Sequence, residues 1–228
     1  MASFKTHLSS GVILAVASVV ATVVFALIPT TEWQMFFSVA FAVMVGAIAP
    51  DIDSDSGIPF HVTFGLLALV AGELAFLFVW KNVSQDPQTL FVYPVMVVVA
   101  VWAIIGPIFK KLTRHRGMAH SIPAAIFAGL LLFTVTVRVG FQDWEAFLLG
   151  VAFSMGYILH LVLDELNSAV NFHGTLFVPN KALGSALKFF SHSRAVTAFV
   201  YISVAFLFLA NERELSQLAA RLYGAVRS

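Results

Sequence analysis

Residues 90–139 read LFVYPVMVVVAVWAIIGPIFKKLTRHRGMAHSIPAAIFAGLLLFTVTVRV. Two long apolar runs, 90–109 and 122–139, enclose a polar stretch, 114–121, that contains two Arg and two His. Each run is close to the ~20 residues that an α-helix needs to cross a bilayer. We therefore predict that the polar stretch lies at a membrane surface, between the ends of two helices.

The composition of the whole chain agrees with this prediction. Its 228 residues are 60% hydrophobic and 11% charged, with a mean hydropathy of +0.92. A net charge of +1 offers no electrostatic footprint for nucleic acid. We expect an all-α, polytopic transmembrane bundle that forms a single domain, 1–228. Because the chain has no Cys, any metal must be held by His, Asp, Glu or backbone oxygen.

Seven apolar runs are candidate membrane spans. They are 8–28, 33–49, 60–80, 90–109, 122–139, 144–163 and 195–210. The last run has about 16 residues, at or below the usual lower limit of ~17, so six to seven spans are expected. The remaining tail, 210–228, is predicted to be amphipathic, because Leu215, Leu218, Leu222 and Val226 share one helix face.

The distribution of Lys and Arg orients these spans. If the N-terminus is cytoplasmic, the cytoplasmic segments hold most of the basic residues, namely Lys5, Lys110, Lys111, Arg114, Arg116, Lys181, Lys188 and Arg194. The outer loops then hold only Lys81 and Arg138. Because cytoplasmic loops carry an excess of Lys and Arg, we predict a cytoplasmic N-terminus in the cytoplasmic (inner) membrane. The side of the tail depends on the seventh span.

Metal-binding residue types gather at the cytoplasmic ends of these spans. The candidate ligands are His7, Asp51, Asp53, His115, His120, His160 and Asp164. They come from separate stretches of sequence, and a chance distribution would scatter them over both membrane faces. We therefore predict one His/Asp site at the cytoplasmic interface.

Two pairs within this set have a spacing that would allow both residues to bind the same metal ion. His160 and Asp164 are four residues apart on a predicted helix and so share a face, where they chelate an ion or the Asp orients the His. The alternative is a buried hydrogen bond between helices. Asp51 and Asp53 would repel each other unless a cation or a proton intervened. Their alternative is an ordinary solvated turn.

The polar stretch adds candidate substrate-binding groups. Gly117, between His115 and His120, permits a tight turn or a close approach to a ligand. The guanidinium groups of Arg114 and Arg116 suit phosphate, although the basic bias of cytoplasmic loops also accounts for their charge.

Three further polar residues have open roles. Ser121 either binds a ligand or caps the helix that follows it. His7 alone would be an ordinary interfacial residue, and only its shared face with the other candidates adds it to the site. Glu73 lies in the middle of a predicted span, where a carboxylate marks an ion pathway or a hydrogen bond between helices.

The order of these motifs resembles that of the YdjM-like family, described as LexA-regulated, membrane-bound, metal-dependent hydrolases. The resemblance covers residues from about 4 to 180. It comprises His7, the APDID sequence at 49–53, the HRGMAHS sequence at 115–121 and the HLVLD sequence at 160–164, with Gly174 and Pro179 after them. Ala119 stands where the family often has Thr. A looser similarity links the His and Asp order to zinc-dependent phospholipases C.

The sequence therefore predicts a membrane-bound hydrolase with a divalent metal, with zinc as the first candidate and manganese or iron as alternatives. The predicted catalytic residues are Arg116, Asp53 and His120, and the predicted substrate-binding residues are Arg114, Arg116 and Ser121. A site at the interface favours a lipid or lipid-linked phosphoester as substrate. The rival hypotheses are a cation transporter, with Glu73 as a relay, and a membrane scaffold whose metal is structural.

Overall fold

The computed structural model of the protein describes residues 3–53, 57–108, 118–169, 187–191 and 193–227. The side chains of 52, 53, 57–60, 63, 169 and 224–227 also lie outside the description. Within the described ranges the chain forms helices, and the only β-type pairing there is an isolated bridge between Ser121 and Lys188. The predicted all-α fold is confirmed.

The structure has ten helical segments within the described residues. In chain order they are α1 (Phe4–Val24), α2 (Trp33–Ile48), the 3-10 helix η1 (Ala49–Asp53), α3 (Gly57–Asn82), α4 (Pro87–Val99), the π-helix η2 (Ala100–Ile105), α6 (Ile122–Val139), α7 (Asp143–Ala169), α8 (Arg194–Ala210) and α9 (Glu212–Arg227). Six candidate spans are long and apolar enough to cross a membrane, and a seventh is added if the bent pair of α8 and α9 counts as one span. The expected polytopic architecture is therefore confirmed.

Two helix ends differ from the predicted ones. The first helix ends at Val24 rather than near residue 28, because Ala26 takes a left-handed backbone conformation with φ of 49°, which a helix cannot continue through. Helix α7 runs to Ala169 rather than to residue 163. His160 and Asp164 therefore lie inside α7, before its last residues, and not at the end of a helix that stops at residue 163.

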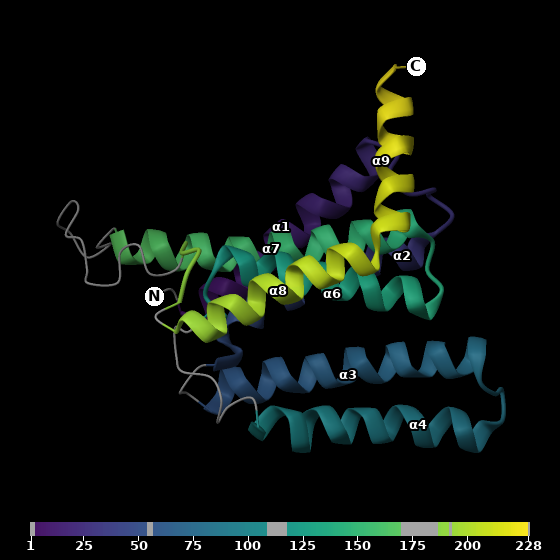
Figure 1. The fold of residues 1–228 in the computed structure, drawn as a ribbon, viewed down its shortest axis with the longest axis horizontal. Coiled ribbons are helices and arrows are strands. Elements are labelled where there is room, and N and C mark those ends of the chain that lie inside the picture. The colour runs from purple at the N-terminus through teal and green to yellow at the C-terminus, as the bar shows by residue number, and fades with distance from the viewer. Residues whose placement is uncertain (1–2, 54–56, 109–117, 170–186, 192, 228) are drawn as a thin grey trace.

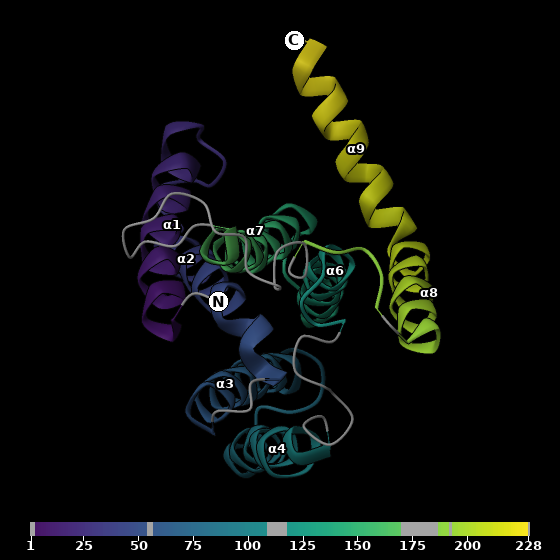
Figure 2. The same cartoon turned by 90° about the vertical axis from the view of Figure 1, so that its left-hand side faces the viewer.

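The helices form two groups, in which α3, α4, α6, α7 and α8 run in roughly the same direction and α1 is tilted relative to them (Figures 1 and 2). Helix α2 packs against α1 and α7, α7 packs against α6, and α8 lies along α6. Helices α3 and α4 form a hairpin beside this group, as the view along the axes shows (Figure 2). The last helix, α9, bends by 69° from α8 and extends away from the other helices instead of running parallel to them (Figures 1 and 2).

Helices α2 and α7 pack closely against each other next to the site, and two glycines allow this contact. A Cβ added to Gly156 would lie 2.8 Å from the backbone nitrogen of Ala47, and one added to Gly46 would lie 3.0 Å from the carbonyl carbon of Phe153. Small residues allow such backbone contact between membrane helices. The contact brings the last turn of α2 against the turn of α7 that carries His160.

Candidate metal centre

Five of the seven predicted ligands meet at one end of the helices. They are His7 from the first two turns of α1, Asp51 from η1, His120 just before α6, and His160 and Asp164 from α7. All five are buried, with relative exposures of 8% or less. Side chains that are far apart in the sequence therefore form one polar cluster inside an apolar protein, which we call the His/Asp cluster.

The carboxylate of Asp164 faces three imidazoles. Its Oδ1 lies 3.3 Å from Nε2 of His7, and its Oδ2 lies 3.8 Å from Nε2 of His160 and 3.9 Å from Nε2 of His120. The predicted sharing of a helix face by His160 and Asp164 is realised in this geometry. Because the other two histidines come from other segments, Asp164 connects α7 to both α1 and the residues that precede α6.

The orientation of His160 is set by the close approach of α2. Its Nδ1 lies 2.8 Å from the carbonyl oxygen of Ala47. A carbonyl oxygen only accepts hydrogen bonds, so Nδ1 carries a proton and donates it. In the neutral ring, Nε2 then presents a lone pair. That atom has no hydrogen-bond partner among the described residues, although Asp51 Oδ1 lies 3.5 Å from it.

A lone pair that faces carboxylate oxygens is repulsive unless a cation lies between them. A second proton on His160 would produce a charge-assisted hydrogen bond, for which a separation of about 2.7–2.9 Å is usual. Separations of 3.5 and 3.8 Å are longer than that. They are close to the ~3.3 Å that separates neighbouring ligand atoms around a tetrahedral zinc ion with bonds of about 2.0–2.1 Å.

The ligand atoms fall into two overlapping groups that share His160. One group contains His7, Asp51 and His160, and the other contains His120, His160 and Asp164. Within each group the potential ligand atoms lie within 4.8 Å of one another. The rings of His7 and His160 stack, with centroids 3.6 Å apart and planes inclined by 10°. The donor set of imidazole and carboxylate fits a divalent metal ion.

Hydrogen bonds outside the cluster hold the His120 segment in place. The Tyr157 hydroxyl, one turn before His160 on α7, donates to the carbonyl oxygen of Ala119. The Ser121 hydroxyl donates to the Met118 carbonyl at 2.6 Å and accepts from the Ala124 amide at 3.3 Å, so it caps α6. Of the two roles considered for Ser121, the structure shows the cap.

Sequence reasoning missed Tyr157 and the Ala47 carbonyl. Tyr157 was detectable, because it lies three residues before His160 and shares its helix face. The role of the Ala47 carbonyl had no signal in the sequence, since it depends on how closely α2 approaches α7.

Several predicted site residues lie outside the described residues. They are His115, Arg114 and Arg116, together with the side chain of Asp53, whose backbone ends η1. Glu73 is described: it lies in α3, within the candidate span Phe64–Asn82, and its side chain is exposed. It is therefore not part of the His/Asp cluster.

A family model described as "YdjM inner membrane protein" matches residues 1–226. No curated protein and no solved structure gives a significant match.

Proposed function

The chain belongs to the YdjM inner membrane protein family, and we propose that it is a metal-dependent hydrolase whose ion is held by the His/Asp cluster. It is an integral inner membrane protein with buried His and Asp groups that can bind a metal ion. The observation that carries the proposal is the orientation of His160. Its Nδ1 is held by Ala47, so that Nε2 is left facing two buried carboxylates.

The proposed ligands combine described and undescribed residues. They are His7, Asp51, His120, His160 and Asp164, which the geometry supports, and Asp53 and His115, which the motif order supports. Zinc is the first candidate, with manganese and iron as alternatives. When bound, such an ion acts as a Lewis acid that polarises a phosphoryl or acyl oxygen and lowers the pKa of water.

The protein's own residues would bind and orient the substrate. In this proposal Arg116 and Arg114 hold a phosphate through their forked guanidinium donors. Asp53 and His120 stay, with Arg116, as the proposed catalytic residues. Ser121 acts instead through its cap of α6, which begins directly after His120.

A phosphoester of a lipid or lipid-linked molecule is the substrate that this location favours. Lys188 pairs with Ser121 in a β-bridge. The next two residues, Phe189 and Phe190, are 51% and 69% exposed. Exposed aromatic rings next to a membrane-embedded site suit contact with acyl chains at the interface. In the proposed orientation, with a cytoplasmic N-terminus, a lipid headgroup reaches the cluster from the cytoplasmic leaflet.

The exposure of Glu73 weighs against the transporter hypothesis. A permeation path needs polar groups that continue across the bilayer. Glu73 is exposed on α3 and is not part of the cluster, so it does not extend the polar cluster through the α1, α2, α6 and α7 group. This favours hydrolysis over transport.

Metal analysis of purified protein tests the proposal. We expect His160→Ala to lose the bound metal while the protein stays folded in detergent, because the apolar helix packing is retained. The matched control is His61→Ala, which removes an exposed imidazole from α3 and should leave the metal content unchanged. Full metal occupancy in His160→Ala would mean that the cluster is only a hydrogen-bonded network.

Two further variants separate the reaction from transport. Arg116→Lys keeps the charge but loses the fork, so metal should stay bound while phosphoester turnover falls. Glu73→Gln should leave turnover nearly unchanged. Loss of cation flux in Glu73→Gln, measured in vesicles, would instead support the transporter.

A further inference from the structure

The C-terminal pair of helices forms a corner at the opposite end of the protein from the His/Asp cluster. Helix α8 runs alongside α6 and ends where α6 ends, and α9 then turns away by 69° (Figures 1 and 2). With 17 residues, α8 is about 26 Å long, close to the ~30 Å hydrocarbon core of a bilayer. Because the spans define the membrane normal, α9 lies close to the membrane plane.

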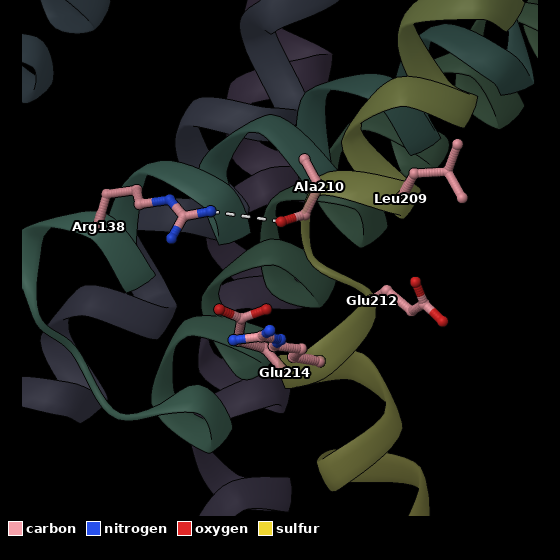
Figure 3. A pocket seen from close by; sticks show the side chains of 6 residues that line it. Arg138, Leu209, Ala210, Glu212 and Glu214 are labelled. Carbon is pink, nitrogen blue, oxygen red and sulfur yellow. Dashed lines mark hydrogen bonds between the residues drawn. The ribbon is translucent and has the colours of Figure 1, made fainter.

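Side chains of α6 hold this corner in place. Asn211, at the bend, is fully buried, and its Nδ2 donates to Thr134 Oγ1 at 2.8 Å and to the Leu207 carbonyl at 2.6 Å. Arg138 donates from Nη2 to the Ala210 carbonyl at 3.3 Å, which satisfies one of the last carbonyls of α8 (Figure 3). These contacts tie the bend between α8 and α9 to α6.

One face of α9 is apolar and only half of it is covered by protein. Leu215 and Leu218 pack against the cluster formed by Phe133 and Ala146. Leu222 lies on the same stripe, one turn further along, and is 45% exposed. The covered half fixes which way the stripe faces, so Leu222 is turned toward the same layer as the ends of α6 and α7.

Charged residues surround the corner. A cavity of about 320 Å³ is lined by Arg138, Leu209, Ala210, Glu212, Arg213 and Glu214. Guanidinium and carboxylate groups at the end of a membrane span lie at the depth of the phospholipid headgroups, with which they are complementary in charge. Apolar residues of α9 on one side and charged residues at its start suit a helix that lies in the headgroup layer.

From the corner, the amphipathic face and the charged cavity, we propose that α8 is a seventh membrane span and that α9 binds the phospholipid interface of the leaflet opposite to the His/Asp cluster. The two chain termini then lie on opposite sides of the membrane. This proposal does not depend on the proposed hydrolase activity.

Single-cysteine variants of the protein test it, because the chain has no Cys. Leu222→Cys places a nitroxide label on the exposed apolar stripe, and Ala220→Cys places one on the opposite, exposed side of α9. In phosphatidylcholine–phosphatidylglycerol vesicles, we expect the Leu222 label to collide several-fold more with oxygen, and less with a water-soluble nickel chelate, than the Ala220 label does.

Three outcomes would overturn the proposal. Equal exposure of both labels to the nickel chelate would show that α9 stands away from the bilayer. Spin–spin broadening at Leu222 would show that a second copy of the chain covers this face instead of lipid. Labelling of Lys5→Cys and Ala220→Cys by an impermeant maleimide from the same side of sealed vesicles would show that α8 does not span the membrane. Labelling from opposite sides is the expected result.

Discussion

The α2–α7 pair and the α3–α4 hairpin are both apolar enough to cross a membrane, yet they pack very differently. Half of the α7 span and 56% of the α2 span are buried inside the protein, compared with 6% of the α4 span. Lipid tails are as apolar as Leu, so hydrophobicity alone does not draw membrane helices together. What distinguishes the first pair is direct backbone contact at Gly46 and Gly156 and the polar cluster beside it.

The two regions also differ in the burial of their ionisable groups. Asp164 on α7 is 2% exposed and faces three histidines, whereas Glu73 on α3 is exposed. A buried carboxylate needs partners or a cation, and the close packing around α7 supplies the imidazoles. Tight packing and the candidate metal centre therefore belong to the same half of the protein.

The largest expected effect comes from filling the α2–α7 contact. Gly156→Leu would drive a side chain into the backbone of Val43 and Ala47, which cannot move aside as a flexible side chain can. Overpacking costs ~1–3 kcal/mol even where neighbours yield, so we expect a loss in the free energy of unfolding of at least about 3 kcal/mol. Thermal unfolding of the purified protein in detergent measures this loss.

Gly65→Leu is the matched substitution in the hairpin. A Cβ on Gly65 meets no atom within 4 Å, so the change in stability should stay within about 0.5 kcal/mol. Equal damage from both substitutions would mean that the hairpin face around Gly65 is packed as tightly as the α2–α7 contact, and the contrast between the two regions would fail.

An intermediate effect is expected from Tyr157→Phe. The variant removes the hydroxyl that holds the Ala119 carbonyl next to His120, without changing any proposed ligand. Loss of such outer contacts typically lowers metal affinity ~10–100-fold, and we expect the lower end of that range. Metal titration measures it, with Tyr93→Phe, which alters an exposed ring on α4, as control. The same affinity in both variants would remove Tyr157 from the supporting contacts.

The smallest effect concerns the loop of the hairpin at low pH. Hydrogen bonds from the Thr89 backbone amide and hydroxyl, at 3.0 and 3.1 Å, hold the pKa of Asp86 below its usual value of 3.8. A lowered pKa means that this cap of α4 stabilises the folded state above pH ~3.8 and is lost as the pH falls through the folded value.

Hydrogen exchange of the Thr89 amide should therefore accelerate, relative to its intrinsic rate, only as the pH falls through the lowered pKa of Asp86. Asp86→Asn, which still accepts hydrogen bonds but does not titrate there, should abolish the acceleration. Core amides around His160 serve as the internal reference. Acceleration that persists in Asp86→Asn would assign the effect to some group other than Asp86.

Much of the fold could be predicted from the sequence, because bilayer thickness fixes the length of an apolar helix that spans it. The predicted run 122–139 coincides with α6, and the short last run, 195–210, corresponds to α8. The helix ends were harder to predict. Nothing in the sequence marks the left-handed conformation of Ala26, and polar residues such as His160 look like the end of a span although α7 continues to Ala169.

The sequence also indicated which residues form the candidate site. His and Asp are rare in this apolar chain, and their helical spacing pairs His160 with Asp164. Only the tertiary structure decided how they meet. The approach of α2 to α7 orients His160 through the Ala47 carbonyl, whereas the packing of α3 leaves Glu73 exposed. The physical reason is that helix contacts in lipid depend on surface shape and on individual polar groups, neither of which follows from hydropathy along the chain.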